Sequence, residues 1–179
     1  MDNMNKTMLI QASLADQPSI EHLWPFYVYD LTRSCGHKRG WQNPTSLSFT
    51  STCVQDYFDD PKSQVFMIKV DDELAGFVMV KQPDFLPGVD WFLSEFYITS
   101  KFQGNGLGQA MAIEVFNRFK GEWALGVLPE NTAASVFWQK TLISYTNNHY
   151  REGYKTKDEL KTPEYPNPYP MNMFYFSSP

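Results

Sequence analysis

The stretch Gln103-Gly104-Asn105-Gly106-Leu107-Gly108 is the most informative part of this chain. It follows a strand-like segment, residues 91–98, and precedes a helix-like segment, residues 107–120. Glycines at every second position leave the backbone N–H groups of this glycine loop accessible, and the start of the following helix adds the positive end of its dipole. The sequence therefore predicts a loop that holds a phosphate or a pyrophosphate.

Spacing excludes two familiar phosphate-binding loops. A P-loop requires Gly, four residues and then Gly-Lys-Ser/Thr, but Gln109 follows Gly108 here. A dinucleotide-binding fingerprint requires Gly-x-Gly-x-x-Gly/Ala. Counting from Gly104 places Gln109 at its third position, and counting from Gly106 places Met111 there. Neither pattern fits.

The loop does match the pattern Gln/Arg-x-x-Gly-x-Gly/Ala, with Gln103, Gly106 and Gly108 in place. In these residues the chain resembles the acyl-CoA pyrophosphate loop of the GNAT N-acetyltransferase superfamily. Residues 94–103 look like the family's strand leading into the loop. Residues 128–138 are similar to its second motif, in which Asn131 opens a helix, an Ala follows three residues later and an aromatic pair follows that. The two motifs together cover roughly residues 91–143.

The resemblance implies an α/β (α+β) fold of GNAT type, a twisted and mostly antiparallel sheet of about six or seven strands with helices on both faces. Patterning by itself predicts strands at residues 8–12, 65–70, 75–80, 91–98, 123–128 and 171–176. It predicts helices from residue 16 or 19 to 31, around 54–58, at 107–120 and after Asn131. Pro25 is expected to kink or break the first helix, and residues 32–44 and 162–170 are expected to be loops.

Composition limits the class of protein. The length of 179 residues predicts one domain, residues 1–179. Hydrophobic residues at 42% indicate a globular chain, while a net charge of −5 without a Lys/Arg cluster argues against a nucleic-acid partner. Two cysteines and no apolar run of membrane-spanning length favour a cytoplasmic protein without a membrane partner. Monomer and homodimer both stay open.

By resemblance, the cofactor is acetyl-CoA, with its pyrophosphate on the backbone N–H groups of residues 104–108 and its pantetheine arm along the strand Glu95 to Ile98. That strand splays from its neighbour in the family, and a backbone N–H near Ile98 would face the thioester oxygen. Asn131 is either a helix N-cap or a contact to the arm, or both. The residues expected to bind the cofactor are Phe96, Ile98, Gln103, Gly104, Asn105, Gly106, Leu107, Gly108, Gln109 and Asn131.

Glu95 is the candidate general base. An amine nucleophile with a pKa of ~10.4 is almost entirely protonated at pH 7, and a positioned carboxylate that removes its proton contributes about 10²–10⁴-fold. Alternation along a strand puts Glu95 and Ile98 on opposite faces unless a bulge intervenes. A structural or exposed carboxylate is the alternative role for Glu95.

Trp138 stands where many family members place a Tyr that protonates the departing thiolate. Trp cannot do this, so water, Tyr145 or Tyr97 would have to supply the proton, and Trp138 is expected to be a packing residue. Cys35, His37 and Cys53 lack metal-ligand spacing, and no metal is expected. The aromatic residues 24–29 and 165–169, with Asp30 and Glu164, form either a pocket for an organic cation or ordinary packing.

The resemblance implies an acyltransferase that moves an acetyl group from acetyl-CoA to a primary amine, on a small molecule or a peptide, by direct attack in a ternary complex. The alternative is a GNAT domain that binds acyl-CoA as a sensor without turnover, which Trp138 keeps open. A nucleotide-binding protein is a third hypothesis, distinguished by stabilisation with NAD or ATP instead of CoA.

Overall fold

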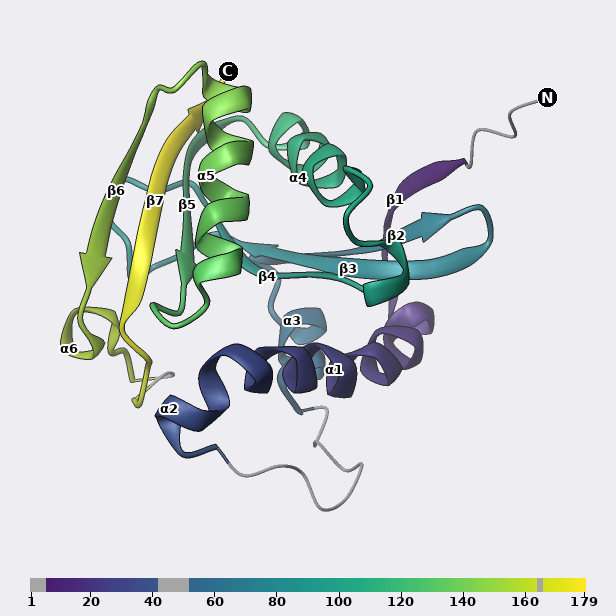
Figure 1. Ribbon diagram of the computed structural model, residues 1–179, viewed down its shortest axis with the longest axis horizontal. Coiled ribbons are helices and arrows are strands. Elements are labelled where there is room, and N and C mark those ends of the chain that lie inside the picture. The colour runs from purple at the N-terminus through teal and green to yellow at the C-terminus, as the bar shows by residue number, and fades with distance from the viewer. Residues whose placement is uncertain (1–5, 42–51, 164–165) are drawn as a thin grey trace.

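One mixed sheet organises the computed structural model, which describes residues 6–41, 52–163 and 166–179. Within these residues its strand order is β1-β2-β3-β4-β5-β7-β6, and every neighbouring pair is antiparallel except β4 and β5 (Figure 1). The seven described strands are β1 Thr7–Gln11, β2 Ser63–Val70, β3 Glu73–Lys81, β4 Trp91–Ile98, β5 Gly121–Val127, β6 Tyr150–Lys155 and β7 Met171–Ser178. This architecture confirms the expected fold class.

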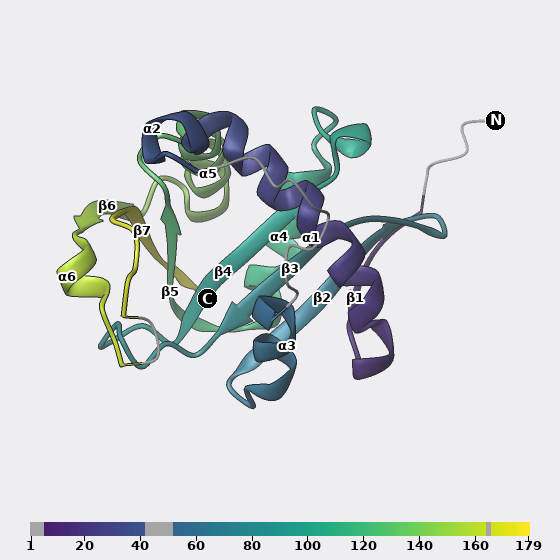
Figure 2. The ribbon, with the colours of Figure 1, turned by 90° about the horizontal axis from the view of Figure 1, so that it is seen from below.

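Helices cover both faces of the sheet. The longer ones are α1 Gln17–Leu31, α3 Thr52–Asp59, α4 Leu107–Arg118 and α5 Thr132–Thr146, and the short ones are α2 His37–Arg39 and α6 Lys157–Leu160. Helices α4 and α5 lie on one face, while α1 and α3 lie on the other (Figures 1 and 2). Strand β4, α4 and β5 form a parallel crossover, which places the glycine loop at the end of β4.

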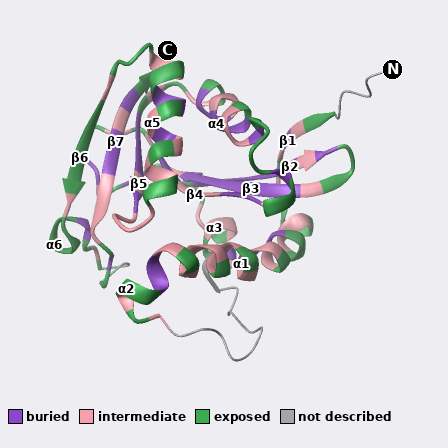
Figure 3. Ribbon diagram, in the orientation of Figure 1, coloured by how far each residue is buried: buried purple, intermediate pink, exposed green. Residues whose placement is uncertain are grey.

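Alternation along the strands divides the core between the two faces. The larger cluster includes Val78 and Ile98 from the sheet, packed against Phe116 of α4 and Trp138 of α5. A second cluster lies under α1 and α3 and includes Ile20, Trp24, Met67, Phe77 and Tyr97. Figure 3 shows the buried strands between these two helical layers.

The pairing of β4 with β5 is short, and this creates the opening that the site uses. Only Trp91–Leu93 pairs with Trp123–Leu125. On the other edge of β4 the register passes from Val80↔Leu93 to Met79↔Glu95, so Ser94 is an extra, bulged residue. Beyond the bulge the two parallel strands separate, as the family resemblance implied.

The structure differs from two expectations for the chain and contains one strand that was not expected. Pro25 does not break helix α1, because Ile20 and Trp24 hold the buried side of the helix on the sheet although one backbone hydrogen bond is lost. Residues 32–39 are helical instead of loop, forming a π-helical turn, Thr32–Gly36, and α2, which ends at Gly40 with φ of 66°. Strand β6 was not predicted, because four of its six residues are exposed and carry no hydrophobic alternation.

Candidate active site

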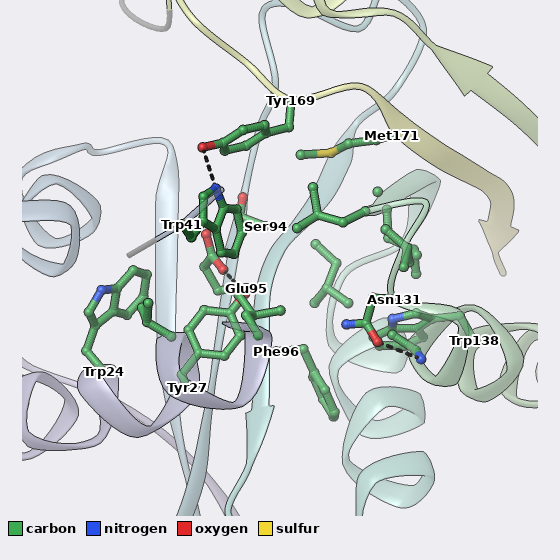
Figure 4. A pocket seen from close by; sticks show the side chains of 18 residues that line it. Trp24, Tyr27, Trp41, Ser94, Glu95, Phe96, Asn131, Trp138, Tyr169 and Met171 are labelled. Carbon is green, nitrogen blue, oxygen red and sulfur yellow. Dashed lines mark hydrogen bonds between the residues drawn. The ribbon is translucent and has the colours of Figure 1, made fainter. Parts of the chain in front are cut away.

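A cavity of about 330 Å³ lies where β4 and β5 separate (Figure 4). Helix α1 and Trp41 bound it on one side, and α5 bounds it on the other. Its lining residues are Trp24, Tyr27, Val28, Leu31, Trp41, Leu93, Ser94, Glu95, Phe96, Leu125, Gly126, Val127, Leu128, Asn131, Ala134, Trp138, Tyr169 and Met171.

Glu95 is the acidic side chain of this lining, and two tyrosines hold its carboxylate. Tyr27 of α1 donates a hydrogen bond to Oε2 at 2.6 Å, and Tyr57 of α3 donates a longer one to Oε1 at 3.4 Å. Burial raises the pKa of Glu95 to about 7, although both hydrogen bonds and the charge of Lys81 act to lower it. A carboxylate with that pKa can both accept and release a proton near neutral pH.

The bulge at Ser94 determines where Glu95 points. Leu93 packs in the cluster under α4 and α5, and without the extra residue Glu95 would face the same way. With it, Glu95 faces α1 and α3, while Phe96 and Ile98 face α4 and α5. Glu95 and Ile98 therefore lie on opposite faces, because the bulge precedes both of them. The structure brings Glu95 and Phe96 to the cavity, but Ile98 is not among its lining residues.

The backbone of Ile98 points to the open edge of β4. The N–H of Thr99 donates to the Ala75 carbonyl of β3 at 2.8 Å. Since successive residues of a strand direct their N–H and C=O groups to opposite edges, those of Ile98 point away from β3, toward the edge that β5 has left. Gln103 donates a hydrogen bond from Nε2 to the Ile98 carbonyl at 2.6 Å, so its side chain braces the loop against the strand.

The glycine loop has the geometry of an anion cradle. Gly104 and Gly106 have φ of 82° and 85°, and a Cβ on either would meet no atom within 4 Å. Gly106 is the N-cap of α4, whose first N–H groups lack partners within the helix. The Asn105 side chain accepts a hydrogen bond from the N–H of Leu107 at 3.2 Å. The open space, the exposed backbone and the helix start fit a pyrophosphate.

Gly108 also has a packing role. A Cβ there would lie 3.3 Å from the ring of Phe137 on α5. Its small size therefore lets α4 and α5 approach each other behind the cavity. Gln109 lies in the first turn of α4.

The second motif contributes one cap and one packed ring. Asn131 is the N-cap of α5, and its side chain accepts from the N–H of Ala134 at 3.2 Å while also lining the cavity. Trp138 is buried, and its ring lies 5.2 Å from Phe96 and 4.7 Å from Phe137 between centroids. It therefore packs as expected, and its indole also lines the cavity.

Tyr145 and Tyr97 were considered as proton donors for the departing thiolate, but neither is among the lining residues of the cavity. The hydroxyl of Tyr145 hydrogen bonds with Asn117 and Ser178 near the far end of α5. Tyr97 lies on the α1 face and donates to Asp30 at 2.8 Å.

The Ser94 hydroxyl at the bulge is buried without a hydrogen-bond partner. Such a group fits a site whose amide-rich ligand completes the hydrogen bonding.

Sequence reasoning missed several residues of the site. Tyr57 and the side chains of Arg39 and Trp41 come from segments without a recognisable motif. Arg39 forms an ion pair with Glu130 at 2.9 Å, and the indole N–H of Trp41 donates to the Tyr169 hydroxyl at 3.1 Å. These contacts join residues 91 and 128 positions apart. The density of aromatic residues could have signalled the contact of Trp41 with Tyr169, but no local pattern signals the ion pair of Arg39 with Glu130.

The aromatic residues considered either for a cation pocket or for ordinary packing lie partly at the cavity and partly in the core, where Trp24 and Tyr27 pack in the cluster under α1. Trp24, Tyr27 and Tyr169 do line the cavity, but Asp30 is not among its lining residues, and Glu164 lies outside the described residues. The side chain of Cys53 also lies outside them. Within the described part of the chain, no group of three or more His, Cys, Asp or Glu side chains could hold a metal ion. No helix in that part is long and apolar enough to cross a membrane.

Comparison with known proteins gives a family and a fold. Residues 21–142 match the model of the acetyltransferase (GNAT) family. None of the curated proteins matches the sequence.

Solved structures agree with this fold over nearly the whole chain. An acetyltransferase from Thermus thermophilus has a TM-score of 0.65 at 18% identity, covering 97% of this chain and 99% of that one. A spermidine N-acetyltransferase from Vibrio cholerae, in complex with CoA and spermine, has a TM-score of 0.59 at 13% identity, covering 96% and 95%. A ribosomal L7/L12 alpha-N-protein acetyltransferase in complex with CoA has 0.60 at 16%, covering 98% and 95%. At these identities the likeness shows the fold alone.

Proposed function

The chain belongs to the GNAT family of acetyltransferases, and we propose that it transfers the acetyl group of acetyl-CoA to a primary amine. The observation that carries the proposal is the placement of Glu95, a carboxylate with a pKa of about 7 at the cavity formed by the separation of β4 and β5. Two structurally similar proteins, a spermidine N-acetyltransferase and a ribosomal protein N-acetyltransferase, act on amines and contain CoA. Both support the same chemistry here.

Each part of the site then has a defined task in binding acetyl-CoA. The N–H groups at the glycine loop and the start of α4 hold the pyrophosphate, and the edge of β4 at Phe96 and Ile98 pairs with the amide-rich arm. Asn131 and the Ser94 hydroxyl lie beside that arm. When bound, acetyl-CoA supplies the activated acetyl group as a thioester. Gln109 belongs to this binding region through its place in the first turn of α4.

Glu95 acts as the general base. It takes the proton that the attacking amine loses, directly or through water, as the new C–N bond forms and the C–S bond breaks. The N–H of Ile98, directed to the open edge of β4, stabilises the developing oxyanion. Solvent can protonate the departing thiolate, because a thiol of pKa ~8.5 is a fair leaving group. The reaction therefore does not require a general acid at the position of Trp138.

Ligand binding and turnover test the proposal separately. We expect CoA and acetyl-CoA to raise the thermal unfolding midpoint, and NAD and ATP to leave it unchanged. We also expect release of free thiol when acetyl-CoA and a panel of amines are added. Stabilisation by CoA without turnover on any amine would favour the sensor function instead, and stabilisation by NAD or ATP alone would remove both.

A further inference from the structure

The half of the cavity that faces α1 is aromatic. Rings of Trp24 and Tyr27 come from α1, Trp41 follows α2, and Tyr169 precedes β7 (Figure 4). The Trp41 and Tyr169 rings are 5.6 Å apart between centroids and are joined by a hydrogen bond. Aliphatic side chains fill the gaps, namely those of Val28, Leu31 and Met171. Such walls favour an apolar or aromatic ligand body.

The described lining of this cavity contains little charge. Glu95 is the one carboxylate among its described lining residues, and none of them is Lys, Arg or His. The oxygens of the Glu95 carboxylate accept hydrogen bonds from Tyr27 and Tyr57. Because this carboxylate carries one negative charge, it can neutralise one ammonium group. A second charge inside these walls would be left without a partner, which is strongly unfavourable.

The surroundings of the cavity disfavour further positive charge. Arg39 lies 4.5 Å from the centre of the Tyr169 ring and is paired with Glu130, so that this carboxylate is already neutralised. Lys38 is also close enough to Glu130 to help lower the pKa of its carboxyl. The basic end of α2 therefore lies next to Tyr169, which lines the cavity.

We infer that the acceptor is a small monoamine with an apolar or aromatic body, and not a polyamine, an amino acid or an aminoglycoside. This inference rests on the proposed function, because it names the substrate of the same site. A polyamine or aminoglycoside carries charges that Glu95 alone does not balance. An amino acid carries a carboxylate, for which the described lining offers no cationic partner. The cavity of about 330 Å³ would also hold the acetyl end of the cofactor arm, so the space that is left for the acceptor suits a compact molecule.

Equilibrium binding in the presence of saturating CoA tests the inference without requiring turnover. The probes are 2-phenylethylamine, hexylamine, spermidine and glycine, titrated by calorimetry at pH 8. We expect 2-phenylethylamine to bind at least tenfold more tightly than spermidine, hexylamine to lie between them, and glycine not to bind. Equal or tighter binding of spermidine, or no binding of 2-phenylethylamine, would overturn the inference.

Variants locate the binding to this cavity. Trp41→Ala and Tyr169→Ala each remove one partly exposed ring, and we expect each to weaken 2-phenylethylamine binding about tenfold. Phe26→Ala is the matched control, since Phe26 is an aromatic residue of α1 that is 61% exposed and does not line the cavity. Unchanged affinity in both cavity variants would contradict the inference.

The two proposals fail differently. Tight 2-phenylethylamine binding without thiol release upholds the acceptor class while contradicting the transferase activity. Rapid acetylation of spermidine with poor turnover of 2-phenylethylamine upholds the activity while contradicting the acceptor class.

Discussion

Glu95→Gln should remove a pH dependence of folding stability that the wild-type protein carries. The pKa of Glu95 is about 7 in the folded protein, above its ordinary value of 4.5. The folded state therefore binds more protons between these two values, and the free energy of unfolding falls as pH rises through them. At 1.36 kcal/mol per pKa unit, the loss between pH 5 and pH 8 is about 2.5 kcal/mol. Gln keeps an oxygen that can accept from Tyr27 but does not titrate.

Urea denaturation at several pH values measures this effect. Its signal is tryptophan fluorescence from the five tryptophans, and the quantity compared is the difference in unfolding free energy between wild type and variant. Subtraction cancels the titration of groups that the substitution leaves unperturbed. Tyr27, Tyr57 and Lys81 face the same carboxylate from α1, α3 and β3 and are common to both proteins. A difference that stays constant from pH 5 to pH 8 would refute the account of Glu95.

Two other predictions concern the cofactor loop and the core. Gly106→Ala places a side chain at φ of 85°, and we expect this strained backbone to lower the stability by about 1–2 kcal/mol. The added methyl group also enters the open space at the loop, so we expect at least tenfold weaker CoA binding by calorimetry. Gly88→Ala is the control, with φ of 78° and equally open space, and it should lose stability while keeping CoA affinity. Phe116→Ala empties a fully buried position against Trp123 and Phe176 and should lower the urea unfolding free energy by about 3–5 kcal/mol; a loss below ~1 kcal/mol would contradict the packing.

The central part of the fold could be predicted from sequence because its signals are local. Strong hydrophobic patterning marks β2, β3 and β4, and Asp71-Asp72 joins β2 to β3, with Asp71 at φ of 54°. The glycine loop sits at the predicted strand-to-helix junction, and Asn131 caps α5. Each of these features depends on residues only a few positions apart.

The remaining features depend on contacts that are distant in sequence. Pro25 is tolerated because the sheet holds α1, and β6 forms because β7 offers it a partner edge. Glu95 could be proposed as a base from its strand, but its hydrogen bonds come from residues 68 and 38 positions away. The bulge at Ser94 depends on registers set by β3 and β5, and it alone directs Glu95 to α1.

The pH dependence of kcat/KM with acetyl-CoA and 2-phenylethylamine tests the central claim about Glu95 most directly. The base must be deprotonated to act, so we expect kcat/KM to rise with pH through a step near 7, separate from the later rise that follows deprotonation of the free amine. In Glu95→Gln we expect the step near 7 to disappear and kcat/KM at pH 8 to fall by about 10²-fold. A variant that keeps both the step and the rate would show that Glu95 is not the base.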